Sequence, residues 1–144
     1  MMRFLLALCF ACFSTAALAA PSYQTNVNTP ISRSDTTIIG QKIEVPKNPT
    51  VIFSSSVFAP GARTPVHKHP YPHYVCIEQG TLTVVREETG KEFSVKSGSC
   101  FVEMIDKFHY GINKGTVPVR ALVIDQVPEG VQVNSVPKDP IEAK

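Results

Sequence analysis

Histidine is scarce in this chain, and its spacing is the strongest chemical signal in the sequence. The four histidines are His67, His69, His73 and His109, so three of them fall within seven residues. Side chains on an extended strand alternate between faces, so His67 and His69 point the same way and lie about 7 Å apart along the strand. Imidazole is the commonest metal ligand near neutral pH. The spacing therefore predicts that both side chains reach one metal ion, the alternative being a chance pair on a solvated strand.

Short strands are the elements that must position these histidines. Apolar runs of about five residues recur at about ten-residue spacing between turns marked by Gly, Pro and Asn, which is typical of an all-β sandwich or barrel. Twelve prolines and little helical apolar spacing argue against a helical bundle. The expected strands are 37–39, 42–45, 51–58, 66–69, 74–77, 81–86, 92–95, 100–104, 109–112 and 117–127.

Around the first three histidines the sequence resembles the cupin family. The family's first motif is a glycine, five residues, His-x-His, three or four residues, a glutamate, six residues and a glycine. The segment from Gly61 to Gly80 has this spacing throughout, with His67 and His69 as the His-x-His pair. The one departure is His73, which stands where the family usually has glutamate.

A second stretch is similar to the second cupin motif. Gly98, His109 and Asn113 fall in register with the glycine, histidine and asparagine of that motif. Met104 and Asp106 stand where the family has proline and glycine. Two motifs in the right order make the resemblance specific.

The resemblance extends over about residues 37–125 and implies a single-domain, all-β double-stranded β-helix, the jelly-roll barrel of cupins. It implies a metal inside the barrel, bound at the positions of His67, His69, His73 and His109. The expected cofactor is a divalent transition metal, namely Fe, Cu, Mn, Ni or Zn. Four neutral imidazoles would leave its full charge of +2, which favours an anionic, chelating small-molecule substrate.

Two glutamates near the motifs are candidates for acid–base chemistry. Glu78 follows His73 by five residues, and an odd offset on a strand turns its side chain away from the metal. Glu103 lies in a run where the family normally has apolar residues. We expect Glu103 on the outer face, with a base close to the metal as the alternative.

The N-terminal 19 residues have the pattern of a cleaved signal peptide. Arg3 precedes the apolar run 4–13, and Ala17, Leu18 and Ala19 form a site that a signal peptidase accepts. We expect cleavage after Ala19 and a secreted or periplasmic protein, the alternative being an uncleaved anchor. The predicted organisation is then an N-terminal arm over 20–36, the barrel over 37–134 and a polar C-terminal tail over 135–144.

Removal of the signal peptide would leave two cysteines, Cys76 and Cys100. The jelly-roll topology implied by the resemblance would place their strands side by side, which allows a disulfide between them. The alternative is a pair of buried, reduced cysteines.

Charge excludes some classes of partner. The chain has 14 basic and 12 acidic residues with no run of either sign, so we expect no nucleic acid partner and, after signal cleavage, no membrane contact. A homodimer is expected by family analogy alone. The favoured function is an exported metalloenzyme, an oxidoreductase of dioxygenase type. The alternatives are a non-catalytic module that binds a small ligand or a metal, and a metal-free barrel.

Overall fold

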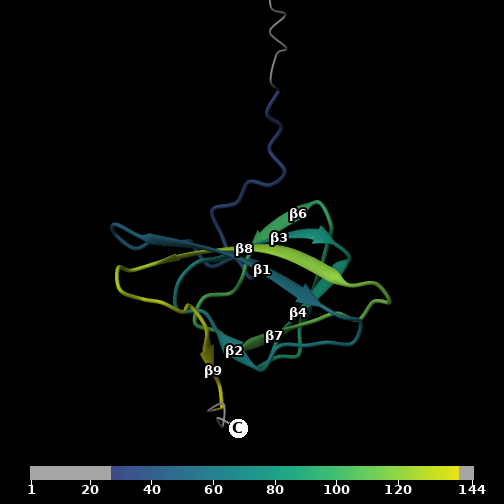
Figure 1. The fold of residues 1–144 in the computed structure, drawn as a ribbon. Coiled ribbons are helices and arrows are strands. Elements are labelled where there is room, and N and C mark those ends of the chain that lie inside the picture. Colours follow the sequence, from purple (N-terminus) through teal and green to yellow (C-terminus); the bar gives the residue numbers. More distant parts are fainter. Residues whose placement is uncertain (1–26, 140–144) are drawn as a thin grey trace, which may run out of the picture.

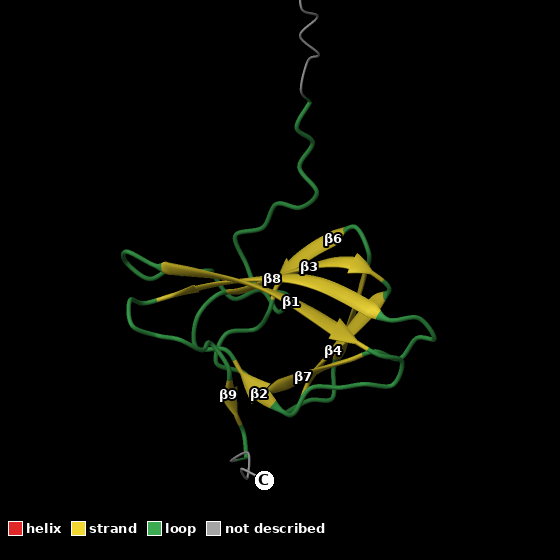
Figure 2. Ribbon diagram, viewed as in Figure 1, coloured by secondary structure: helices red, strands yellow, loops and turns green. Residues whose placement is uncertain are grey.

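The computed structural model describes residues 27–139, which form two antiparallel sheets packed face to face (Figure 1). Strands and loops make up this whole part of the chain (Figure 2). The signal peptide predicted for 1–19 lies outside the described residues. Between residues 27 and 139, no helix is long and apolar enough to cross a membrane.

Within the part of the chain that the structure describes, nine strands build the two sheets. One sheet has the order β1-β8-β3-β6, and the other has the order β5-β4-β7-β2-β9. Their bounds are β1 Thr50–Phe58, β2 His67–Lys68, β3 His73–Gln79, β4 Thr81–Arg86, β5 Glu92–Lys96, β6 Ser99–Val102, β7 His109–Ile112, β8 Val119–Val127 and β9 Val136–Pro137. The expected all-β jelly-roll barrel of a single domain is confirmed.

Alternation of side chains along the strands explains which face is buried. On β8, Val119, Ala121, Val123, Asp125 and Val127 are buried, and the residues that alternate with them are more exposed. Such period-two burial is what a half-buried strand requires. The buried side chains of β8 pack with those of β3 and β4 to form the hydrophobic core between the sheets.

The strands predicted at 37–39 and 42–45 are wrong. Gly40 has a φ of 83°, and its N–H donates to the carbonyl of Thr37, so the chain reverses at once and forms only an isolated bridge between Thr36 and Lys42. The side-chain amide of Gln41 bonds both backbone groups of Ile105, at 2.8 and 2.9 Å. The turn is thus fastened through a side chain instead of a strand ladder.

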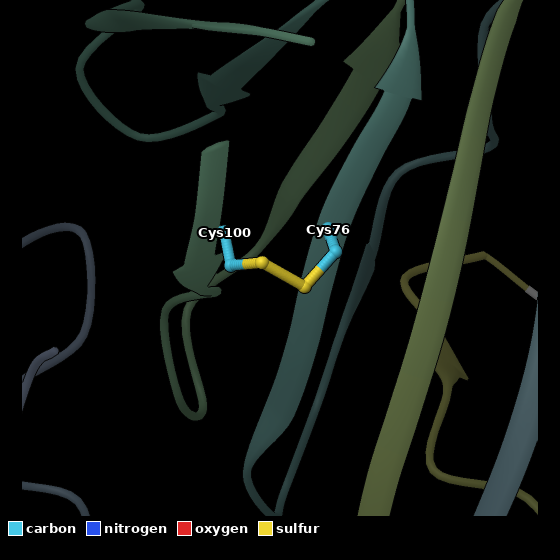
Figure 3. Close-up of a disulfide and its surroundings, with 2 residues drawn as sticks. All are labelled: Cys76 and Cys100. Atoms are coloured by element: carbon cyan, nitrogen blue, oxygen red, sulfur yellow. A yellow bond between two sulfur atoms is a disulfide. The ribbon is translucent and has the colours of Figure 1, made fainter. Parts of the chain in front are cut away.

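A disulfide joins Cys76 on β3 to Cys100 on β6 (Figure 3). The two residues are direct partners in the strand register, and their Cα atoms are 4.0 Å apart. The bridge closes a loop with a sequence separation of 24 residues. It therefore links the strand at the end of the first motif to the strand at the start of the second motif.

The C-terminal segment is part of the sheet where the sequence predicted a tail from residue 135. In β9, Val136 pairs with Lys68 and Pro137 pairs with His67. The backbone of Lys138 adds a hydrogen bond to the carbonyl of Val66. After β8 the chain therefore returns to the strand that carries the His-x-His pair, as Figure 1 shows.

Candidate metal centre

Four histidines and one glutamate converge from both sheets. His67 lies on β2, His69 follows that strand, and His109 begins β7 opposite His67 in the strand register. His73 begins β3, and Glu103 directly follows β6. Pairing between β2 and β7 therefore joins the two sequence motifs, and the packing of the sheets adds Glu103.

The carboxylate of Glu103 lies at the centre of the cluster. Its Oε2 is 2.8 Å from Nε2 of His109, 3.0 Å from Nε2 of His69 and 3.9 Å from Nε2 of His73. Nε2 of His67 is 3.2 Å from Nε2 of His69. One ligand atom each from His67, His69, Glu103 and His109 lie within 4.8 Å of one another, a spacing that a single metal ion can span.

Each of the four imidazoles has its Nδ1 atom fixed by an oxygen acceptor. A carbonyl or carboxylate oxygen can only accept, so Nδ1 must carry the hydrogen and Nε2 of a neutral ring must carry a lone pair. For His67, His69 and His109 the acceptors are the carbonyls of Pro65, Asn134 and Lys107, at 2.8, 2.5 and 2.7 Å. For His73 the acceptor is Oδ1 of Asp125, at 2.7 Å.

These tautomers leave the centre of the cluster rich in electron pairs. The Nε2 lone pairs of neutral rings and the carboxylate of Glu103 face one another at 2.8–3.9 Å. Such an arrangement is repulsive unless a cation lies among the atoms. The donor set therefore fits a metal ion that accepts both nitrogen and oxygen ligands.

Protonation equilibria show that the cluster attracts positive charge, which protons on Nε2 atoms can also supply. Burial lowers the pKa of His67 to about 4, so its imidazole is neutral near pH 7. Burial acts to raise the pKa of Glu103, but hydrogen bonds with His109 and His69 outweigh it and hold that pKa well below its usual range. The pKa of His109 is raised, because the hydrogen bond to Glu103 overcomes burial. Glu103 is thus ionised and attracts positive charge.

The expectation that Glu103 faces outward is wrong, since its side chain is buried and only 5% of the residue is exposed. A signal in the sequence could have shown this. Cys76 lies at an odd offset from His73 and faces outward, so a Cys100 paired with it also faces outward. Glu103, three residues further on, then faces inward. Glu78 is exposed, as expected.

His73 lies beside the four-residue group. Its ring stacks on that of His69, with centroids 3.8 Å apart and an interplanar angle of 6°. Together with Asp125 the two rings form a second group that could hold an ion. Burial acts to raise the pKa of Asp125, but the hydrogen bond with His73 outweighs it and lowers that pKa. The structure therefore brings His73 to the cluster together with the carboxylate of Asp125, to which it is hydrogen-bonded.

Sequence reasoning missed Asn134, which is buried next to the cluster. Its backbone carbonyl accepts from Nδ1 of His69, and its side-chain amide nitrogen donates to Oδ1 of Asp125 at 2.6 Å. Its side chain also bonds both backbone groups of Tyr71, each at 3.1 Å. Asn134 thus connects the C-terminal segment to His69 directly and to His73 through Asp125. A lone asparagine in a loop carries no sequence signal for such a role.

A cavity of about 210 Å³ opens beside the histidines and Glu103. Its walls away from these ligand atoms are largely apolar. The apolar side chains are those of Phe58, Val75, Leu82, Ala121 and Val123. The cavity leaves room for a small molecule next to a bound ion.

One departure from the second cupin motif is explained by the backbone. Asp106 stands where the family has glycine, and its φ is 51°, in the left-handed region that glycine favours. Aspartate is among the few other residues that tolerate this region. The turn before His109 is therefore kept, and the Asp106 side chain pairs with Lys68 at 2.9 Å.

Comparison with known proteins agrees with this architecture. Residues 55–125 match the Cupin domain family. The polyketide cyclase RemF from Streptomyces resistomycificus has a similar structure, with a TM-score of 0.53 and 17% identity over 64% of this chain and 63% of that one. An oxalate decarboxylase from Lactobacillus farciminis, solved as a formate complex, has a TM-score of 0.52 and 22% identity over 62% of this chain and 27% of that one.

At these identities the likeness shows the fold alone, and this chain spans less than two thirds of either protein. No curated protein matches the sequence. The two motifs, the two-sheet barrel and the matched domain together place the chain in the cupin superfamily.

Proposed function

We propose that this protein binds a divalent transition metal and acts as a metalloenzyme on a small chelating substrate, with dioxygenase-type oxidation as the favoured reaction. The proposed ligands are His67, His69, Glu103 and His109. One observation carries the proposal: every imidazole of the cluster has its Nδ1 hydrogen engaged by an oxygen, so each neutral ring has its lone pair on Nε2, the atom that lies at or beside the buried carboxylate.

This ligand set differs from the four-histidine set expected from the sequence, in which His73 replaced the family's glutamate. The atoms of the proposed set lie within 4.8 Å of one another. His73 has its Nε2 3.9 Å from Glu103 and is bonded to Asp125. We therefore assign His73 to a position beside the ion, facing the cavity.

The presence of Glu103 changes the charge that a substrate would meet. A divalent ion with three neutral imidazoles would keep its full charge, whereas the carboxylate neutralises one unit and leaves +1. When bound, such an ion would polarise coordinating oxygen atoms and, if redox-active, exchange electrons with dioxygen. The adjoining cavity supports an enzyme over a storage site, because catalytic sites keep a position open to substrate.

The residues around the ligands would hold and shield this centre. Carbonyls of Pro65, Lys107 and Asn134 orient three imidazoles, and the apolar walls exclude water from the cavity. The His73–Asp125 pair lies where a proton could be held at Nε2 of His73 close to a substrate.

We further propose that the protein is exported. The signal-peptide pattern of residues 1–19 supports this location. The disulfide between Cys76 and Cys100 supports it independently, because disulfides persist mainly in oxidising compartments.

Metal content tests the proposal. We expect about one transition-metal ion per chain in protein purified without chelators, and loss of the metal in a His67→Ala/His69→Ala double variant. The matched pair Glu103→Gln and Glu78→Gln separates the buried carboxylate from an exposed one on β3. Metal-free protein that does not bind added ions would contradict the proposal. Bound metal without oxygen uptake on any chelating substrate would favour the non-catalytic module.

A further inference from the structure

The cavity beside the cluster has the size of one ring. Its volume of about 210 Å³ exceeds the roughly 150 Å³ of an apolar protein cavity that takes up benzene. It lies below the range of about 300–1,000 Å³ for pockets that bind drug-sized ligands. Phe58, Leu82 and Val123 are among the side chains that line it. Such walls favour a flat apolar body over a sugar or an extended polar chain.

Basic side chains are absent from the lining. Three cavities meet at the histidines, and among the residues that the structure describes none of the three is lined by a lysine or an arginine. The nearby Lys68 and Lys138 are paired with Asp106 and Glu87 instead. A second negative charge on a ligand would therefore find no cation other than the metal.

Charge balance limits the ligand to a single negative charge. A divalent ion coordinated by three neutral imidazoles and the carboxylate of Glu103 carries +1, which one negative charge neutralises. A dianion would leave an uncompensated negative charge in the cavity, and the carboxylate of Asp125 lines the neighbouring cavity that shares His69 and His73. Burying an unpaired charge is far more costly than burying a neutral complex.

A ligand with two hydroxyl groups, of which one is ionised, also matches the hydroxyl groups at the cavity wall. Ser56, Thr64 and Ser135 line the same cavity, and a hydroxyl can accept the hydrogen that such a ligand keeps. These groups are neutral, so they add no preference for a second charge.

We infer that the site is built for a monoanionic, bidentate oxygen ligand on a single apolar ring, that is, a catechol-type compound, and that it disfavours small dianions such as dicarboxylates. This inference rests on the proposed function, because it needs a metal at the histidines. It goes beyond that function by assigning the substrate's charge, size and polarity.

Calorimetric titration of the zinc-loaded full chain tests the inference without turnover, because zinc is redox-inert. Zinc binding is measured first, and catechol and oxalate are then titrated separately. We expect the ratio of catechol to oxalate affinity to be at least about tenfold higher on the protein than for zinc ions in solution, from the apolar contacts of one ring.

Two variants identify the cause of the preference. Ala121→Leu fills the cavity from β8 and should weaken catechol binding at least about tenfold while oxalate changes less than about threefold. Ala59→Leu, a matched change at an exposed position, should alter neither affinity. Ser56→Arg adds a cation from edge strand β1 and should shift the ratio towards oxalate at least about tenfold.

The outcomes separate the inference from the proposed function. No zinc binding would overturn both. Zinc binding with a catechol-to-oxalate ratio no higher than that of free zinc would overturn the inference and leave the metal site standing. If Ala121→Leu does not fold, the Ser56→Arg variant decides, because Ser56 is only half-buried and lies at the sheet edge. An unchanged ratio in Ser56→Arg would then overturn the inference.

Discussion

Oε2 of Glu103 lies 2.8 Å from Nε2 of His109, in a site where both residues are buried. The Nδ1 hydrogen of His109 is engaged by the carbonyl of Lys107, so a neutral ring presents a lone pair to the carboxylate. Two acceptors at this distance need a proton or a metal ion between them. This pair is the most direct sign in the fold that a cation belongs at the cluster.

Replacing the carboxylate tests that relationship. We expect Glu103→Gln to lower zinc affinity by about 100-fold or more, because the amide removes the one negative charge of the proposed ligand set. Glu78→Gln removes an exposed carboxylate on β3 and should leave the affinity unchanged. Calorimetry of both variants measures the effect, and equal affinities would refute a role for Glu103 as ligand.

Asn134 should matter for both folding and metal binding. Asn134→Ala leaves the backbone of Tyr71 without two hydrogen bonds and Asp125 without one, which should cost about 1–3 kcal/mol of unfolding free energy. The side chain of Asn134 also fixes the segment whose backbone carbonyl accepts from Nδ1 of His69, so its loss should lower zinc affinity by about 10-fold or more. Denaturant unfolding and calorimetry are the measurements, with exposed Asn28→Ala as the control. A wild-type metal affinity would restrict Asn134 to a structural role.

The disulfide should stabilise the barrel without affecting the metal. Cys76→Ser/Cys100→Ser opens a covalent loop, and we expect a loss of about 3 kcal/mol in unfolding free energy. The bridge lies on the outer face, away from the cavity, so metal content should not change. Denaturant unfolding with and without a reductant checks this, and the reductant should have no effect on the double variant.

Gly80 should tolerate substitution much less than Gly90, although both have positive φ. A Cβ at Gly80 would come within 2.9 Å of the carbonyl oxygen of Pro118 and 3.2 Å of Val119 Cα, whereas at Gly90 it would meet nothing within 4 Å. We expect about 1 kcal/mol of destabilisation for Gly90→Ala, from the left-handed backbone alone. Gly80→Ala should lose at least about 1 kcal/mol more, because backbone atoms must shift. Similar losses in thermal unfolding would contradict this account.

Local features of the chain were accessible from the sequence. The alternation of side chains on a strand is a property of the backbone, so the spacing of His67 and His69 was enough to place both rings on one face. The turn residues and the motif spacing likewise predicted the barrel and the approach of His109. Where the prediction of strands was wrong, at 37–39 and 42–45, a single side chain, Gln41, replaced the expected ladder.

Only the tertiary structure decided what surrounds the proposed metal ligands. Glu103 reaches the cluster because β6 pairs with β3 in a register that turns its side chain inward. A register shifted by one residue would satisfy the local sequence pattern equally well, and it would turn the side chain outward. Asp125 and Asn134 approach His73 and His69 from 52 and 65 residues away in sequence. No local propensity encodes such contacts, because they arise from strand pairing and loop closure across the whole barrel. The sequence by itself thus determined the fold and three of the proposed ligands, and the packing of the two sheets determined the charge of the site and the shape of its cavity.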